Sequence, residues 1–379
     1  MDNSSEKLKV CGIIAEFNPF HNGHAFLIQE ARKITGCDAV IIVMSGNFVQ
    51  RGEPAVTDKW TRAEFAVKNG ADAVIELPFA YSVQSASQFA RGGVSLLKAA
   101  GADWIAFGSE CGNPENLKEI AETPTDPDHL RISLREGLSF PKAYSLLTGS
   151  MLPNDILAVS YLKAIGDAPI TPVVIQRQGS YTDDNLGSFA SAYAIRRALK
   201  EKREIGESTP MHDILMDSPL LFPEMYYPYL RTLLLTTPKE KLRDIFLVSE
   251  GIESHLIRQA ESCSSYDSFI RASTTYRYTS SRIRRTILQI MTQTTKEEVR
   301  NLPAPDTLRI LAVNDTGRKW LASLRGSEVR TACRFSQIPL PYRLMESRAA
   351  YLYASVLPEE QRKTILDNEI RGTHYVPSL

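Results

Sequence analysis

The chain has 379 residues, of which 43% are hydrophobic and 23% are charged, an ordinary balance for a globular protein of two or three domains. It contains no run of about 18 apolar residues that would cross a membrane as a helix, and the short polar stretch before residue 9 lacks the apolar core of a secretory signal. The five cysteines are scattered and include no Cys-x-x-Cys pair, so the sequence predicts neither a zinc site nor a disulfide framework. We therefore expect a cytoplasmic protein with reduced thiols and no membrane partner.

The formal net charge is zero, but the charge is unevenly distributed along the chain. Residues 271–379 contain 18 Lys and Arg against 10 Asp and Glu, a net charge of +8, which leaves −8 on residues 1–270. Such an asymmetry is typical of proteins that contact nucleic acid. The alternative is a solvated basic face without a partner, and charge alone does not separate the two.

The first strand and helix of the chain enclose two histidines. The apolar run 10–15 predicts a buried strand, Asn18-Pro19 then interrupts the chain, and the spacing of apolar residues in 23–34 predicts a helix. His21 and His24 therefore lie on the turn and the first helical turn after the strand, where ligands bind in parallel α/β sheets. The free N–H groups of the helix N-terminus favour phosphate there, and Gly23 would let it approach the main chain.

Further strands and helices alternate through the first half of the chain. Segments rich in apolar residues at 38–44, 73–77, 104–107 and 170–176 predict strands, and residues 59–68 and 85–99 predict helices between them. Consecutive strand–helix units imply a parallel sheet with right-handed crossovers, so the sequence predicts a Rossmann-like, doubly wound α/β domain. Residues 123–137 are mostly polar and predict an insertion.

The strand signal fades beyond Leu199. Helical spacing of Leu, Ile and Tyr dominates residues 213–300 and 343–370. We therefore predict two domains: an α/β domain over 9–200 that carries the two histidines, and a mostly α-helical, basic C-terminal domain over 201–379.

The pattern His21-x-Gly23-His24 after a first strand resembles the signature of the HIGH nucleotidyltransferase superfamily. In that superfamily both histidines bind the triphosphate and stabilise charge on the α-phosphate during nucleophilic attack, so the resemblance implies that His21 and His24 are the catalytic residues. Such chemistry needs donors aimed at developing negative charge. The alternative, two polar residues in a loop, fits the strand, glycine and helix around them less well.

Longer stretches narrow the resemblance. Residues 16–24, 44–55, 75–78, 108–110 and 153–157 are together similar to the tRNA(Met) cytidine acetate ligase family. The resemblance implies that ATP and acetate form acetyl-adenylate and pyrophosphate. The acetyl group then passes to N4 of the wobble cytidine of elongator tRNA(Met), and AMP is released.

The resemblance also implies the residues that bind ATP. They are a continuous stretch and three separate positions: Ile14, Ala15, Glu16, Phe17, Asn18, Pro19, Phe20, His21, Asn22, Gly23, His24, Ala25, Phe26, Leu27, Gly108, Asn154 and Arg177. Taken singly, the last three are equally well a turn glycine, a helix cap and a surface arginine. A second superfamily signature implies phosphate binding by Ser191, as a helix N-cap, and by Arg196. The chain departs from the family pattern at Tyr193 and Asp155, which puts local contacts in doubt but not the type of reaction.

Two basic segments of the C-terminal part suit RNA. Residues 277–285 interleave arginines with tyrosine and hydroxyl side chains, a composition that favours phosphate contact and stacking on unpaired bases. With the family resemblance, we predict RNA contacts by Arg277, Arg282, Arg284, Arg285 and, from a second basic turn at 314–319, Arg318. A solvated basic face is the alternative for each segment.

Two other functions stay open at this point. A small-molecule nucleotidyltransferase would leave a nucleotide joined to its acceptor, and it has no need of a basic helical domain. An ATP-binding regulatory protein without turnover is less consistent with two intact histidines. The sequence contains no cluster of metal ligands, so we expect Mg²⁺ to arrive with ATP and to be held by its phosphates. Specificity for acetate depends on the shape of a pocket, which residues alone do not give.

Overall fold

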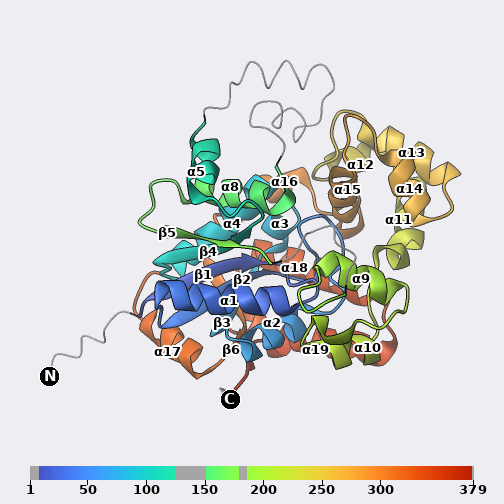
Figure 1. Ribbon diagram of the computed structural model, residues 1–379. Coiled ribbons are helices and arrows are strands. Elements are labelled where there is room, and N and C mark those ends of the chain that lie inside the picture. Colours follow the sequence, from blue (N-terminus) through green and yellow to red (C-terminus); the bar gives the residue numbers. More distant parts are fainter. Residues whose placement is uncertain (1–7, 124–150, 179–185, 378–379) are drawn as a thin grey trace.

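The computed structural model describes residues 8–123, 151–178 and 186–377 (Figure 1). The predicted insertion at 123–137 therefore lies almost wholly outside the described residues. The strands are β1 (Val10–Ala15), β2 (Ala39–Ser45), β3 (Ala73–Leu77), β4 (Trp104–Ser109), β5 (Thr171–Gln176), β6 (Thr307–Val313), β7 (Arg330–Ala332) and β8 (His374–Tyr375). The helices of the first half are α1 (Asn22–Thr35), α2 (Lys59–Lys68), α3 (Phe79–Ser82), α4 (Ala86–Ala99), α5 (Pro114–Glu122), α8 (Pro153–Ile165) and α9 (Ala192–Lys200). Those of the second half are α10 (His212–Asp217), α11 (Tyr227–Thr236), α12 (Lys239–Asp244), α13 (Ile252–Ser262), α14 (Tyr266–Ser273), α15 (Ser280–Thr292), α16 (Lys296–Arg300), α17 (Asp315–Ser323), α18 (Leu340–Ala354) and α19 (Glu359–Arg371).

One sheet organises the molecule, with strand order β5-β4-β1-β2-β3-β6-β7 and β8 paired to β6. Strands β1 to β5 run parallel to one another, and β6 is antiparallel to β3. The helices α1 and α2 pack on one face, and α4 and α8 pack on the other (Figure 1). Trp320 of α17 joins the same apolar cluster as α4 and α8. Because both faces are covered, β2 and β3 are buried along their whole length, and this explains why β2 is apolar from Ala39 to Met44 and why β3 is apolar except for Glu76.

The predicted α/β architecture is confirmed, and each of the five strands expected in the first half exists within two residues of its predicted bounds. The part of the chain beyond Leu199 is mostly helical, as predicted, but it also contains three strands that the sequence analysis did not identify. Strand β6 extends the sheet beyond β3, and β7 and β8 pair with β6. The boundary at 200/201 therefore does not separate two structural units, because residues 307–376 return to the first one.

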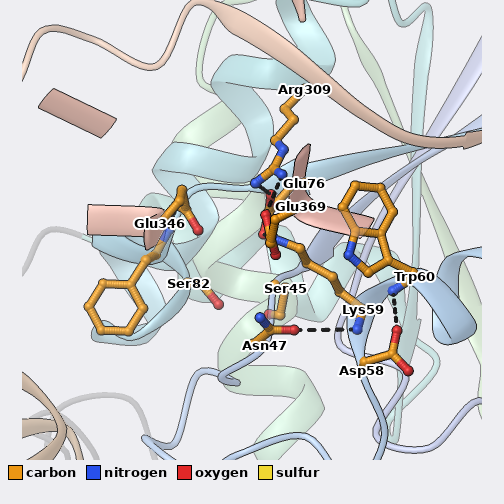
Figure 2. Close-up of polar contacts among 12 residues, drawn as sticks. Ser45, Asn47, Asp58, Lys59, Trp60, Glu76, Ser82, Arg309, Glu346 and Glu369 are labelled. Atoms are coloured by element: carbon orange, nitrogen blue, oxygen red, sulfur yellow. Dashed lines mark hydrogen bonds and ion pairs between the residues drawn. The ribbon is translucent and has the colours of Figure 1, made fainter. Parts of the chain in front are cut away.

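A buried ionic cluster joins this returning segment to the sheet (Figure 2). Lys59 Nζ lies 2.7 Å from Glu76 and 2.6 Å from Glu369, and the Arg309 guanidinium lies 2.5 Å from each of the same carboxylates. A third carboxyl, that of Glu346 on α18, accepts the N–H that begins α3 at 2.7 Å. Such buried charges are tolerated only when they are paired, and here the pairs connect α2 and β3 with β6 and α19.

The helices α11 to α15 form a separate unit beside the sheet, coloured yellow to brown in Figure 1. This unit has its own apolar core, which runs from Tyr227 to Ile290 and is centred on Leu256, Phe269 and Ile283. The prediction of a helical region is confirmed for these residues. Within the described ranges, no helix is both long and apolar enough to span a membrane.

Candidate active site

The carboxyl ends of β1, β4 and β5 open onto one cleft, bordered by α1, α8, α9 and the loop that follows β2. The cleft encloses about 1280 Å³, including space that is open to solvent. This edge of a parallel sheet is where the strand order favours ligand binding.

His21 and His24 lie side by side at the start of α1. His21 is the N-cap of α1, and its side-chain Nδ1 accepts the main-chain N–H of Gly23 at 3.0 Å. The main-chain N–H of His21 donates to the side-chain Nδ1 of His24 at 3.2 Å. The two ring centroids are 3.7 Å apart, and Phe17 packs edge-on against His24. Because each Nδ1 accepts a hydrogen bond, each neutral ring carries its proton on Nε2, where it is a donor.

Both histidines are neutral near pH 7. Burial, together with the guanidinium groups of Arg177 and Arg196, lowers the pKa of His21 to about 3. Burial, followed by His21 and Arg177, lowers the pKa of His24 well below its ordinary value. The pair therefore offers N–H donors, while the positive charge of the cleft is carried by Arg51, Arg177 and Arg196. Fixed donors of this kind stabilise charge that develops on a phosphate.

A buried arginine holds the ends of β1 and β2. Arg62 is 0% exposed, and its guanidinium donates to the carbonyls of Glu16 at 2.6 Å, Ser45 at 3.1 Å and Thr57 at 3.1 Å, and also to that of Gly46. The carbonyls of Glu16, Ser45 and Gly46 lie at or just beyond the ends of β1 and β2, where a buried side chain supplies the hydrogen-bond partner that a neighbouring strand would otherwise supply. The turn that carries the histidines is thereby attached to the loop after β2.

Residues that follow β4 and begin α8 form another wall. Asn154 Nδ2 donates to Glu110 Oε1 at 2.6 Å, and Asp155 Oδ1 accepts the Glu110 N–H at 3.0 Å. The departure at Asp155 thus has a structural role, since the side chain ties α8 to the β4 loop. A Cβ at Gly108 would lie 3.1 Å from Arg177 Cγ, so glycine there leaves room for the arginine to cross the strand end.

The N-terminus of α9 faces the cleft. Ser191 is its N-cap and accepts the Ala194 N–H at 3.1 Å, which confirms the predicted capping. Arg196 Nη1 donates to the carbonyl of Asn18 at 2.6 Å and so connects α9 to the turn after β1. Tyr193, the second departure from the family pattern, lines the cleft and is 45% exposed.

Comparisons with known proteins identify this arrangement. The family model described as HIGH Nucleotidyl Transferase matches residues 8–368. A tRNA(Met) cytidine acetate ligase from Geobacillus sp. (strain WCH70) is 35% identical, covering 96% of this chain and 98% of the relative, and that of Limosilactobacillus reuteri is 39% identical, covering 93% and 97%. The crystal structure of Thermotoga maritima TmcAL bound with alpha-thio ATP superposes with a TM-score of 0.87 at 32% identity, over 98% of this chain and all of that one.

The chain belongs to the tRNA(Met) cytidine acetate ligase family.

The structure brings most of the ATP-binding residues predicted from this family into one cleft. This cleft is lined by Ile14 to Asn18, His21, Gly23, His24, Phe26, Leu27, Gly108, Asn154, Arg177, Ser191 and Arg196. Four residues of the predicted stretch do not: Pro19, Phe20, Asn22 and Ala25. Phe20 is fully buried, and Asn22 donates instead to the carbonyls of Ser188 and Glu207 at 2.9 and 2.7 Å.

Sequence reasoning missed other residues of the cleft. Val49, Arg51 and Glu53 come from the loop after β2, which the family resemblance included but to which no role was given. Their position after the carboxyl end of a parallel strand was the available signal. Phe89, Phe107, Leu157 and Tyr161 also line the cleft, and in the sequence they are indistinguishable from core residues.

The predicted RNA-binding arginines of this family member divide into two groups. One group lies on or next to α15 and consists of Arg277, Arg282, Arg284 and Arg285. The main chain of α15 at Arg284 packs against Gly52 in the loop after β2. Arg318 lies on α17, which begins next to Asp72 at the amino end of β3, the sheet edge opposite the cleft. The structure therefore does not bring Arg318 together with the other four.

The arginines on α15 differ in their pairing. Arg284 forms an ion pair with Glu53 at 2.8 Å, and Arg282 lies 3.5 Å from Glu250. Arg285 makes no hydrogen bond or ion pair with any residue in the described ranges, and burial, together with Arg282 and Arg51, lowers its pKa to about 10. A half-buried guanidinium without a carboxylate is suited to an external anion.

No group of three or more His, Cys, Asp and Glu that could hold a metal ion occurs within the part of the chain that the structure describes.

Proposed function

We propose that this protein activates acetate with ATP and transfers the acetyl group to N4 of the wobble cytidine of elongator tRNA(Met). One observation carries the proposal: two neutral histidines with Nε2 donors at the N-terminus of α1, beside three arginines, in a chain of the acetate ligase family. The products are AMP, pyrophosphate and N4-acetylcytidine in tRNA. We place this reaction in the cytoplasm.

In the first step, a carboxylate oxygen of acetate forms a bond to the α-phosphorus of ATP while the bond to the pyrophosphate oxygen breaks. Negative charge grows on the α-phosphate and on the leaving pyrophosphate. His21 and His24 would donate from Nε2 to the α-phosphate, and Arg196 with the N-terminus of α9 would hold the leaving group. Mg²⁺ would be carried by the ATP phosphates and would neutralise part of their charge.

In the second step, the exocyclic amine of cytosine attacks the acetyl carbonyl, the bond from the carbonyl carbon to the AMP oxygen breaks, and the amine loses a proton. The amine is a weak nucleophile because its lone pair is delocalised into the ring, so acetate has to be activated first. A base in a single-stranded anticodon loop is reached at low cost in unstacking. Arg285 on α15 would contact the phosphate backbone.

The deciding experiment incubates the purified protein with ATP, labelled acetate and tRNA, and then analyses nucleosides and nucleotides. We expect N4-acetylcytidine together with free AMP and pyrophosphate, and no product when acetyl-CoA replaces ATP and acetate. A small-molecule nucleotidyltransferase would instead leave AMP attached to an acceptor and the tRNA unmodified. A regulatory ATP-binding protein would release no pyrophosphate with any carboxylate.

A further inference from the structure

One part of the cleft wall, formed by residues of β1, β4, α4 and α8, is apolar, and we refer to it as the apolar recess. Its walls are five side chains that the phosphate chemistry does not use: Ile14, Phe89, Phe107, Leu157 and Tyr161. Except for the half-buried Leu157, they are between 1% and 7% exposed. Among these five side chains the Tyr161 hydroxyl is the polar group, and Glu16, just after β1, lines the same cleft.

At the apolar recess, α4 packs closely against β1. A Cβ at Gly93 would lie 2.6 Å from Ile14 Cδ1, so α4 reaches this position only because residue 93 lacks a side chain. Phe89 lies one turn earlier on α4, and its ring is thereby brought to the carboxyl end of β1.

Tyr161 is the polar group of the recess. It is 4% exposed, its ring centroid lies 5.5 Å from that of Phe107, and its hydroxyl makes no hydrogen bond to any residue in the described ranges. Burial, with a smaller effect of the Glu16 charge, raises its pKa, so the hydroxyl stays protonated and is a donor. The hydroxyl is open to the cleft, where it can donate to a ligand that accepts a hydrogen bond.

We propose that this apolar recess is the acyl subsite: the acetate methyl group packs against Ile14 and Phe89, and the Tyr161 hydroxyl donates to a carboxylate oxygen. The assignment rests on the proposed function. The recess begins at the end of β1, directly before the turn with the two histidines, so an acid held there presents its carboxylate to the α-phosphate. An adenine base in the recess is the competing occupant.

The first test enlarges the recess. Leu157→Ala removes a half-buried wall from α8, and Leu162→Ala on the same helix is the matched control because it does not line the cleft. Carboxylate-dependent exchange of pyrophosphate into ATP is measured with acetate, propionate and butyrate. We expect kcat/KM for butyrate relative to acetate to rise at least tenfold in Leu157→Ala and to be unchanged in the control. An unchanged ratio in both variants would overturn the assignment.

The second test removes only the donor. In Tyr161→Phe, we expect the KM for acetate to rise about tenfold or more while the Kd for ATP, measured without acetate, stays the same. Weaker ATP binding with an unchanged KM for acetate would assign the recess to the nucleoside and overturn the proposal. A wild-type protein that exchanges pyrophosphate with no carboxylate would overturn the proposed function itself, and the subsite with it.

Discussion

The buried ionic cluster makes a prediction that the structure specifies in detail. Lys59 and Arg309 balance Glu76 and Glu369, so a third charge, on Glu346, would have no partner. Burial and the neighbouring Glu76 raise the pKa of Glu346 from 4.5 to about 8. Because the folded state holds this proton more tightly than the unfolded state, its contribution to stability is complete below pH 4.5 and is lost as the pH rises to about 8.

The perturbation is Glu346→Gln, which removes the titrating group and keeps an oxygen that accepts the Phe79 N–H. The free energy of unfolding, from urea titrations at pH 5 to 8, should fall for the wild type relative to the variant by about 1.4 kcal/mol per pH unit. Glu328→Gln, at an exposed position, is the control and should parallel the wild type. Parallel curves for Glu346→Gln would refute the reasoning, because they would mean that the folded protein already holds this carboxyl ionised.

Three further predictions concern the cleft and α15. His24→Ala should lower the rate of acetate-dependent pyrophosphate exchange about 100- to 1000-fold, with an unchanged circular dichroism spectrum. Activity near that of the wild type would remove His24 from the mechanism. In the wild type, the pH profile of the rate should show no titration of His21 between pH 6 and 8, since its pKa is about 3. Gly52→Ala should lower the Tm, because the glycine has φ +79° and its Cβ would lie 2.6 Å from the main chain of Arg284; an unchanged Tm would show that the loop adapts. Arg285→Gln should weaken tRNA binding, and the slope of the logarithm of the tRNA association constant against the logarithm of the salt concentration should decrease in magnitude by about 0.7 to 1. The matched variant Arg284→Gln should mainly lower the Tm. Equal salt slopes for Arg285→Gln and the wild type would assign Arg285 to a solvated face.

The strands of the first half could be predicted because buried parallel strands are short apolar runs that end at polar or helix-breaking residues. Val10–Ala15 ends before Glu16, and Ala73–Leu77 ends at Pro78. Strand β6 begins with Thr307-Leu308-Arg309 before its apolar run, and Arg309, like Glu76 in β3, is a buried charge within a strand. The partners that make this arginine tolerable are 233 and 60 residues away, so its burial could not be read from the local sequence.

The candidate site likewise contains residues that the sequence predicted and residues that it did not. The histidine turn was predictable because its chemistry is local: a strand, a glycine and a helix N-terminus follow one another within a few residues. The walls of the apolar recess were not, because Phe89 and Tyr161 belong to helices whose apolar faces look like any core face. Whether such a side chain meets a cleft depends on how closely α4 and α8 approach β1, and that is a property of the tertiary packing.

The loop after β2 gives the two proposed half-reactions a common structural element. On one side Val49, Arg51 and Glu53 line the cleft, and the Gln50 N–H donates to Glu16 Oε1 at 2.7 Å. On the other side Glu53 forms an ion pair with α15, and Gly52 packs directly against its main chain. A displacement of α15 therefore acts on the same few residues that border the histidine turn. In the proposed reaction, acetyl-adenylate is lost by hydrolysis if water reaches it before tRNA does. The loop after β2 contacts both the turn with the two histidines and α15, so it is where binding of the RNA would be linked to protection of the intermediate from water.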